Sequence, residues 1–127
     1  MNRSSLVACL FFVAIVATSG CGERKVVFSE GMLGAPLPRE SWPKDCDQAA
    51  TMVIEALPKL HRRTFGGEGP ATLNMLNGQD GLGGAVRARF GLASGNDLLI
   101  RSCVPVSGSA ASASLEIMTR ASVRLRR

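Results

Sequence analysis

An apolar segment at the start of the chain, ending at Cys21, limits what the remaining sequence can form. The basic start Met1-Asn2-Arg3 precedes an uncharged apolar run over residues 6–17. This run is shorter than the roughly 20 apolar residues that a membrane-spanning helix needs, and it fits the apolar core of a signal peptide. We therefore predict that residues 1–20 are removed on export, which leaves one small domain to fold outside the cytoplasm.

The end of this segment resembles the lipobox of bacterial lipoproteins. Ser19-Gly20-Cys21 matches it, although Thr18 stands where Leu is usual. The resemblance implies cleavage after Gly20, a diacylglyceryl group on the Cys21 thiol and an acyl chain such as palmitate on the new amine. Two or more acyl chains anchor a protein stably, whereas one holds it only marginally. The alternatives are an ordinary secretory signal cut near Gly20 and an uncleaved anchor. Gly22 in place of Asp favours the outer membrane, facing the periplasm, by resemblance to bacterial sorting rules.

Four cysteines divide into two groups. Cys9 lies in the predicted signal and Cys21 is the predicted lipidation site, so Cys46 and Cys103 remain as a pair. Disulfides form and persist in oxidising compartments, and we predict that these two residues form one, worth about 4 kcal/mol in the chain-entropy model. A cysteine nucleophile or a metal site has little support, because His61 is the only histidine and the pair is not a CxxC motif. We expect no cofactor and no metal.

The net charge argues against one class of partner. It is +5 for the whole chain and +4 once Arg3 leaves with the signal. The basic residues gather at the C-terminus without interleaved aromatic residues, so we expect no nucleic-acid partner. They suit a helix end, whose dipole favours cations, or contact with anionic lipid or lipopolysaccharide. These residues are Arg120, Arg124, Arg126 and Arg127.

Residues 21–40 are predicted to be a flexible tether and residues 41–127 a helical domain. Glycine and proline recur through the tether and disfavour regular structure there. Beyond it, apolar residues recur at helical spacing. We expect an all-α fold, a small bundle of about four to five short helices, stapled by the disulfide.

Local signals place the helix ends. Asp45 opens a pattern like a capping box, and Pro58 is expected to end that helix near residue 57, with one further turn over 60–65. Asn96 is the expected N-cap of a later short helix. Glu116 and Arg120 are expected to form an i,i+4 ion pair on the exposed face of the last and longest helix. Helices are expected over residues 46–57, 71–77, 85–90, 97–103 and 110–126.

The glycine-rich stretch over residues 78–84 could suggest a phosphate-binding loop. No predicted strand precedes it and no Walker lysine follows, so the stretch lacks the context that such a loop requires. We predict instead that Gly83 and Gly84 let a neighbouring helix approach closely, and the helix that starts at Cys46 is the expected neighbour.

Four segments resemble, in order, those of a small bacterial helical domain family of unknown function. They are WPKDCDQA at 42–49, GLGGAVRARFGL at 81–92, ASGNDLL at 93–99 and ASLEI at 113–117. The family patterns are WP…A, GLGxxIRxxFGL, GNxxLL and ASxxI, and the resemblance covers about residues 40–125. It implies a helical fold and carries no activity.

The chain departs from that family at three positions. Alanine occupies positions 85 and 93, where the family has Trp or another large residue, and position 88, where Asn is usual. These losses thin the core or a surface groove, so any ligand that the family shares is in doubt.

Four residues of the resemblance form a candidate interaction or structural motif. Structural roles account for each of them. Trp42 can pack as a lid over the first helix, and Arg87 can bond helix-end carbonyls or an acid, with a ligand contact as the alternative. Gly95 and Asn96 can form a turn and cap. The four residues are Trp42, Arg87, Gly95 and Asn96.

We expect an envelope lipoprotein without enzymatic activity that binds an unknown envelope protein or supports envelope structure. An inhibitor or immunity protein against an exported enzyme is the alternative. A small periplasmic hydrolase is a weaker one, because nucleophilic or acid–base chemistry needs a positioned pair of groups. His61 stands beside two arginines, and Glu55 and Glu68 belong to no matched motif.

Overall fold

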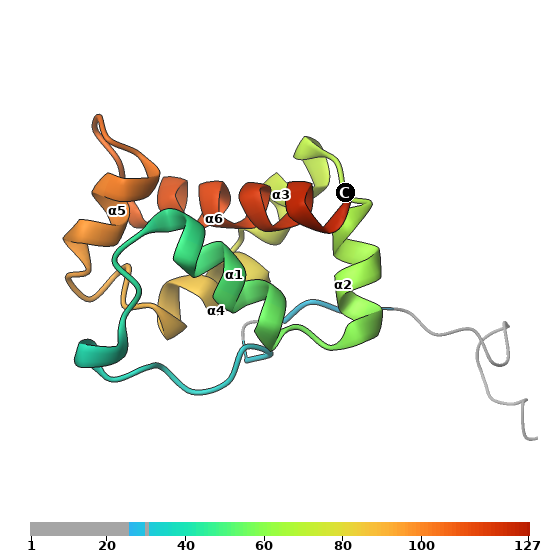
Figure 1. The fold of residues 1–127 in the computed structure, drawn as a ribbon, viewed down its shortest axis with the longest axis horizontal. Helices are drawn as coiled ribbons and strands as arrows, with labels where there is room; N and C mark the ends of the chain where they lie inside the picture. The colour runs from blue at the N-terminus through green and yellow to red at the C-terminus, as the bar shows by residue number, and fades with distance from the viewer. Residues whose placement is uncertain (1–25, 30) are drawn as a thin grey trace, which may run out of the picture.

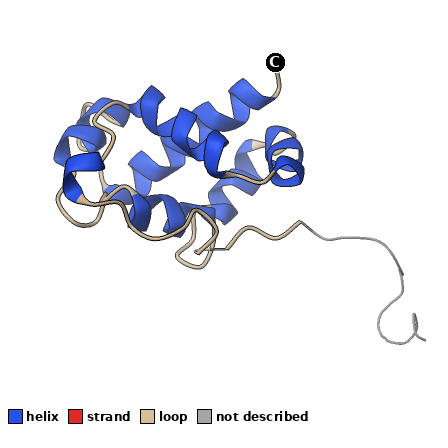
Figure 2. Cartoon of the chain, turned by 60° about the horizontal axis from the view of Figure 1, so that its bottom comes forward, coloured by secondary structure: helices blue, strands red, loops and turns tan. Residues whose placement is uncertain are grey.

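Helices account for all the regular structure in the described part of the chain. The computed structural model describes residues 26–29 and 31–127, where it contains six α-helices, one 3₁₀ turn and no strand (Figures 1 and 2). The predicted all-α class is confirmed, whereas the predicted signal peptide and Cys21 lie outside the described residues. None of the described helices combines the length and the apolar character needed to cross a bilayer. The elements are η1 (Arg39–Ser41), α1 (Cys46–Ala56), α2 (Lys59–Gly66), α3 (Pro70–Leu76), α4 (Leu82–Arg89), α5 (Asp97–Cys103) and α6 (Ala110–Leu125).

The helix count exceeds the prediction because α2 is a helix of its own and not a further turn of α1. Pro58 cannot continue α1, but its φ of −60° suits the start of a helix, and its carbonyl oxygen accepts from the Arg62 N–H at 3.0 Å. The Arg62 side chain then reaches back and donates to the Leu57 carbonyl oxygen at 2.9 Å. The turn between α1 and α2 is therefore stabilised by hydrogen bonds from the backbone and the side chain of Arg62.

Helix α6 is the centre of the bundle. It packs against α1, α2, α3, α4 and α5, and it crosses the middle of the view in Figure 1. Its start is fixed by a capping box between Ser109 and Ser112, and its end lies one residue before the predicted one. Small residues on its inner faces let several helices approach at once. The buried residues of α6 are Ala113, Ser114, Ile117, Met118, Ala121 and Ser122.

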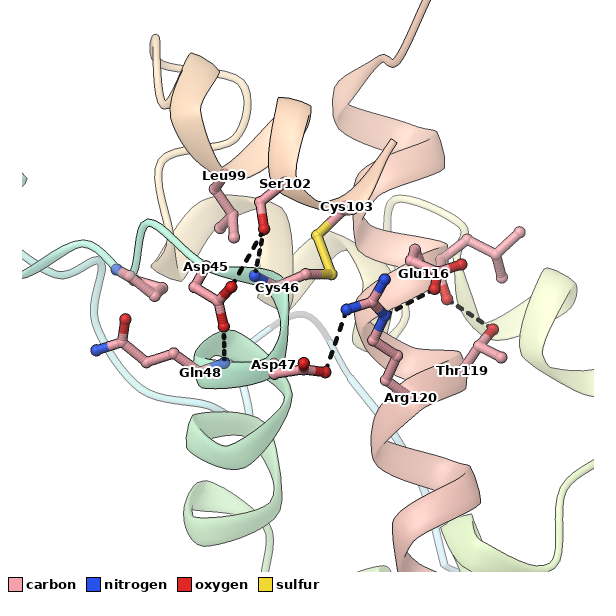
Figure 3. Close-up of a disulfide and its surroundings, with 12 residues drawn as sticks. Asp45, Cys46, Asp47, Gln48, Leu99, Ser102, Cys103, Glu116, Thr119 and Arg120 are labelled. Carbon is pink, nitrogen blue, oxygen red and sulfur yellow. Dashed lines mark hydrogen bonds and ion pairs between the residues drawn. A yellow bond between two sulfur atoms is a disulfide. The ribbon is translucent and has the colours of Figure 1, made fainter. Parts of the chain in front are cut away.

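Helix α1 lies along α6 and is tied to it by charge. The Asp45 carboxylate accepts from the Gln48 N–H at 3.1 Å, which confirms the predicted cap. Asp47 accepts from Arg120 at 3.1 Å and lies 3.0 Å from Arg124. The predicted Glu116–Arg120 pair is also present at 2.8 Å (Figure 3), and its hydrogen bond raises the pKa of Arg120.

The Cys46–Cys103 disulfide is confirmed. It joins the start of α1 to the end of α5, with a Cα–Cα distance of 5.0 Å and a sequence separation of 57 positions. The Ser102 hydroxyl beside it accepts from the Cys46 N–H at 2.9 Å (Figure 3). The bridge and this hydrogen bond hold α5 against α1.

The described part of the predicted tether is irregular apart from η1, but it lies against the bundle. Leu33 is only 5% exposed. Phe28 meets the His61 ring edge-on at 5.3 Å and the Phe65 ring at 5.7 Å. The Leu37 N–H donates to the carbonyl oxygen of Arg89 at 2.9 Å. The packed unit therefore begins well before residue 41.

The glycines at the start of α4 do permit a close approach, but the predicted neighbour is wrong. A Cβ on Gly83 would collide with Asn77, and one on Gly84 would collide with the Gln79 carbonyl oxygen. Both contacts are with the turn that leads into α4, and neither is with α1. This packing also explains why α4 begins at Leu82, three residues before the predicted start.

Candidate functional site

A hollow of about 550 Å³ lies where η1 and the segment after it face the start of α5. We call it the η1–α5 groove. Its wall brings together residues about 55 positions apart in sequence, including the predicted Trp42, Gly95 and Asn96. Its full lining is Arg39, Glu40, Trp42, Lys44, Gly95, Asn96, Asp97, Leu98 and Arg101.

Three contacts fix the position of the Trp42 side chain. Its indole N–H donates to the Leu37 carbonyl oxygen at 3.0 Å, and the Arg39 guanidinium lies 4.7 Å from the ring centre, within the range of a cation–π contact. The ring lies so close to Gly91 that a Cβ there would overlap it, and Gly91 has φ +68°. The sequence analysis predicted that Trp42 packs over the first helix. In the structure the ring covers Gly91, in the turn after α4.

Asn96 joins the parts of the groove, and its predicted cap is confirmed. Its side-chain oxygen accepts from the Leu99 N–H at 3.3 Å. Its amide nitrogen donates to the carbonyl oxygens of Pro43 at 3.1 Å and Phe90 at 2.8 Å. The residue is only 5% exposed, and Gly95 before it makes the turn with φ +104°. One buried side chain therefore fixes the end of α4, the start of α5 and the segment after η1.

The groove carries three cations and two acids beside apolar surface. Arg39, Lys44 and Arg101 are exposed, and none of them forms an ion pair with another described residue. Leu98 is 52% exposed beside them. The two acids of the lining, Glu40 and Asp97, also form no ion pair with another described residue. Such a surface can hold an apolar side chain and an acidic group together, because burial and charge act at adjacent points.

Arg87 lies outside the groove, in a polar cluster between helices. Its guanidinium donates to the Asn77 side-chain oxygen at 3.1 Å and to the Ser114 hydroxyl at 2.8 Å. The Ser114 hydroxyl donates in turn to the same Asn77 oxygen at 2.6 Å. The expected partners, helix-end carbonyls or an acid, are therefore wrong. Burial lowers the pKa of Arg87, and the cluster ties the end of α3 and helix α4 to α6.

His61 lies on α2, far in sequence from the groove residues. Its Nε2 lies 3.0 Å from the Val27 carbonyl oxygen, and its ring contacts Phe28. Within residues 26–29 and 31–127, no three His, Cys, Asp or Glu side chains gather in a way that could hold a metal ion. The geometry of His61 is that of a packing residue.

Sequence reasoning missed Arg39, Leu98 and Arg101. Each is an exposed residue with no local signal, and they meet only because Asn96 and the disulfide bring η1 and α5 together. A search for basic residues near a single tryptophan would have selected Arg39 and Lys44 but not the residues of α5.

Comparison of the chain with protein-family models, with curated proteins and with solved structures found no match. The resemblance of residues 40–125 to a family of small helical domains therefore stays a prediction.

Proposed function

We propose that this chain is a lipid-anchored envelope protein that performs no catalysis and binds a protein partner through the η1–α5 groove. The observation that carries the proposal is the pairing of apolar surface, the exposed Leu98 and the half-buried Trp42, with three cations that form no ion pair with another described residue. Tryptophan and arginine are enriched at interfaces and at the residues that dominate their energy. The matching partner surface is a segment with an apolar side chain flanked by acidic residues.

The location rests on the sequence and on one structural feature. The Cys46–Cys103 disulfide is compatible with a compartment outside the cytoplasm. Anchoring through acylated Cys21, facing the periplasm and in the outer membrane, is the finer part of the proposal. Globomycin, which blocks lipoprotein signal cleavage, should trap the precursor, and Cys21→Ser should abolish acyl labelling. Normal envelope anchoring of that variant would refute the anchor.

A pull-down tests the groove. The tagged full-length protein, isolated from detergent-solubilised envelope, is expected to retain a partner that Leu98→Asp loses by at least about tenfold, because a buried unpaired carboxylate at an interface costs more than 1.4 kcal/mol. Met75→Asp is the matched control, since Met75 is 80% exposed on α3 and does not line the groove. Equal retention by both variants would contradict the proposal. Inhibition of a captured exported enzyme would favour the inhibitor role.

A further inference from the structure

One end of the bundle gathers both ends of the described chain around α2. The Val27 carbonyl oxygen lies 3.0 Å from His61 Nε2 on α2. At the other end of the same helix, the Phe65 carbonyl oxygen accepts from the Ser122 hydroxyl at 3.0 Å, and Gly66 packs on Leu125. Figure 1 shows the same arrangement, with the N-terminal entry, α2 and the C-terminus together and α5 at the opposite end.

The distance from the proposed anchor to this end is short. Cys21 precedes Val27 by six residues, and six residues span at most about 20 Å when fully extended. Helix α6, which has 16 residues, is about 24 Å long. Because the chain is already packed on α2 at Val27, the anchor holds this end of the bundle near the bilayer, and not the end that carries α5.

The surface at this end has the composition of a membrane-contacting face. Leu60, which precedes His61 on α2, is 44% exposed, and Val27, whose carbonyl oxygen meets His61, is 64% exposed. Four exposed cations lie on α2 or at the chain end that follows Leu125, the residue against which Gly66 of α2 packs, and none forms an ion pair with another described residue. They are Lys59, Arg63, Arg126 and Arg127. The acids nearest to α2 in sequence are Glu55 and Glu68. Arg127 also borders a hollow that contains Asp47 and Glu116, but these two carboxylates already pair with Arg120 and Arg124. The surface therefore keeps an excess of positive charge.

We propose that this α2 surface, formed by Val27, Leu60 and the four cations, docks on the anionic headgroups of the bilayer that holds acylated Cys21. Cations near an anionic membrane are attracted to it, and exposed apolar side chains enter the headgroup boundary. The inference rests on the proposed lipid anchor. Docking in this way turns the opposite end of the bundle, with the η1–α5 groove, away from the membrane and toward a partner.

Tryptophan fluorescence tests the docking. The full-length protein is expressed, isolated with its acyl chains and reconstituted into nanodiscs of phosphatidylglycerol and phosphatidylcholine with brominated acyl chains, which quench nearby indoles. The only tryptophan of the wild type is Trp42, in the groove, and Leu60→Trp adds one on the α2 surface. We expect the emission added at position 60 to be quenched and the Trp42 emission to be unaffected.

Charge variants in the Leu60→Trp protein test the electrostatic part. Arg63→Gln with Arg127→Gln removes two cations, and should lower the docking equilibrium about fivefold for each, about 25-fold together. Ala93→Glu with Val106→Glu changes the net charge equally at exposed positions outside both surfaces, and should leave the quenching unchanged. Circular dichroism confirms that each variant keeps its helices.

The outcomes separate the docking from the anchor. Intact mass reports whether Cys21 is acylated; a missing acyl mass overturns the anchor and the docking together. A correct mass without quenching at position 60, or equal quenching at Trp42, overturns the docking alone. Quenching that is as strong in discs of phosphatidylcholine only also overturns it. A third result would overturn the docking as well: no quenching at position 60, together with a co-purifying protein that the Arg63→Gln, Arg127→Gln variant loses. The surface would then belong to a protein interface.

Discussion

The side-chain amide of Asn96 donates to the carbonyl oxygen of Pro43, 3.1 Å away and 53 residues earlier in the chain. The same amide also bonds the Phe90 carbonyl oxygen, and the side-chain oxygen caps α5 at Leu99. All three bonds are buried. A residue that the sequence identifies only as a helix cap is therefore also the tertiary link that closes the η1–α5 groove.

Replacing Asn96 should lower the stability of the domain. Asn96→Ala removes the cap and leaves two buried carbonyl oxygens without a partner, so we expect a loss of about 2–3 kcal/mol in the free energy of unfolding. Chemical denaturation measures it. Asn74→Ala is the matched control, because Asn74 is exposed on α3 and its side chain makes no hydrogen bond with another described residue. A similar loss in both variants would show that Asn96 has no special role.

The disulfide should account for a large share of the stability. Cys46→Ala with Cys103→Ala opens a loop of 57 residues, and the chain-entropy model gives a loss of about 4 kcal/mol. For a domain of this size that is a considerable part of the total. Denaturation of the double variant, compared with reduced wild type, measures the loss. Mass spectrometry without reductant should show the linked peptides, and two free thiols in protein isolated from the envelope would refute the bridge.

Much of the fold follows from local signals. Helix α5 spans the predicted residues, because Asn96 caps its start and Pro105 follows closely after its end. Helix α6 ends one residue before the predicted position. The start of α4 was harder to predict from sequence, because glycine disfavours helix and residues 82–84 therefore have the composition of a loop. Only the contacts with Asn77 and Gln79 show why glycine is required there.

The candidate site follows much less from sequence. Trp42, Gly95 and Asn96 come together as a group that the resemblance also singled out, but Arg87 belongs to a different cluster with Asn77 and Ser114. Its partners are neutral side chains, Asn77 directly after α3 and Ser114 on α6. No sequence spacing predicts either the groove residues or the Arg87 cluster, because helix packing brings the members of each group together from distant parts of the chain.

The start of α4 provides a test of the glycine packing. Gly84→Ala places a Cβ against the Gln79 carbonyl oxygen, and overpacking of this kind typically costs about 1–3 kcal/mol. Gly67→Ala is the control, since a Cβ there meets only the Thr64 carbonyl oxygen at an ordinary 3.6 Å. The denaturation midpoint should fall for Gly84→Ala alone. Saturable nucleotide binding that is lost in this variant would instead favour the phosphate-loop interpretation.

Gly91 should control the shape of the groove through Trp42. A Cβ at Gly91 overlaps the indole ring, and φ +68° disfavours any side chain by about 1–2 kcal/mol. Gly91→Ala should therefore lower stability and also push the ring out of its place, which shifts the emission of this single tryptophan to longer wavelength.

Gly95→Ala is the matched control: its φ of +104° carries a backbone cost as well, but the nearest atom to its Cβ is an Arg39 nitrogen 3.9 Å away. We expect that variant to lose stability without a shift in emission. Unchanged emission in Gly91→Ala would show that the glycine does not set the position of Trp42.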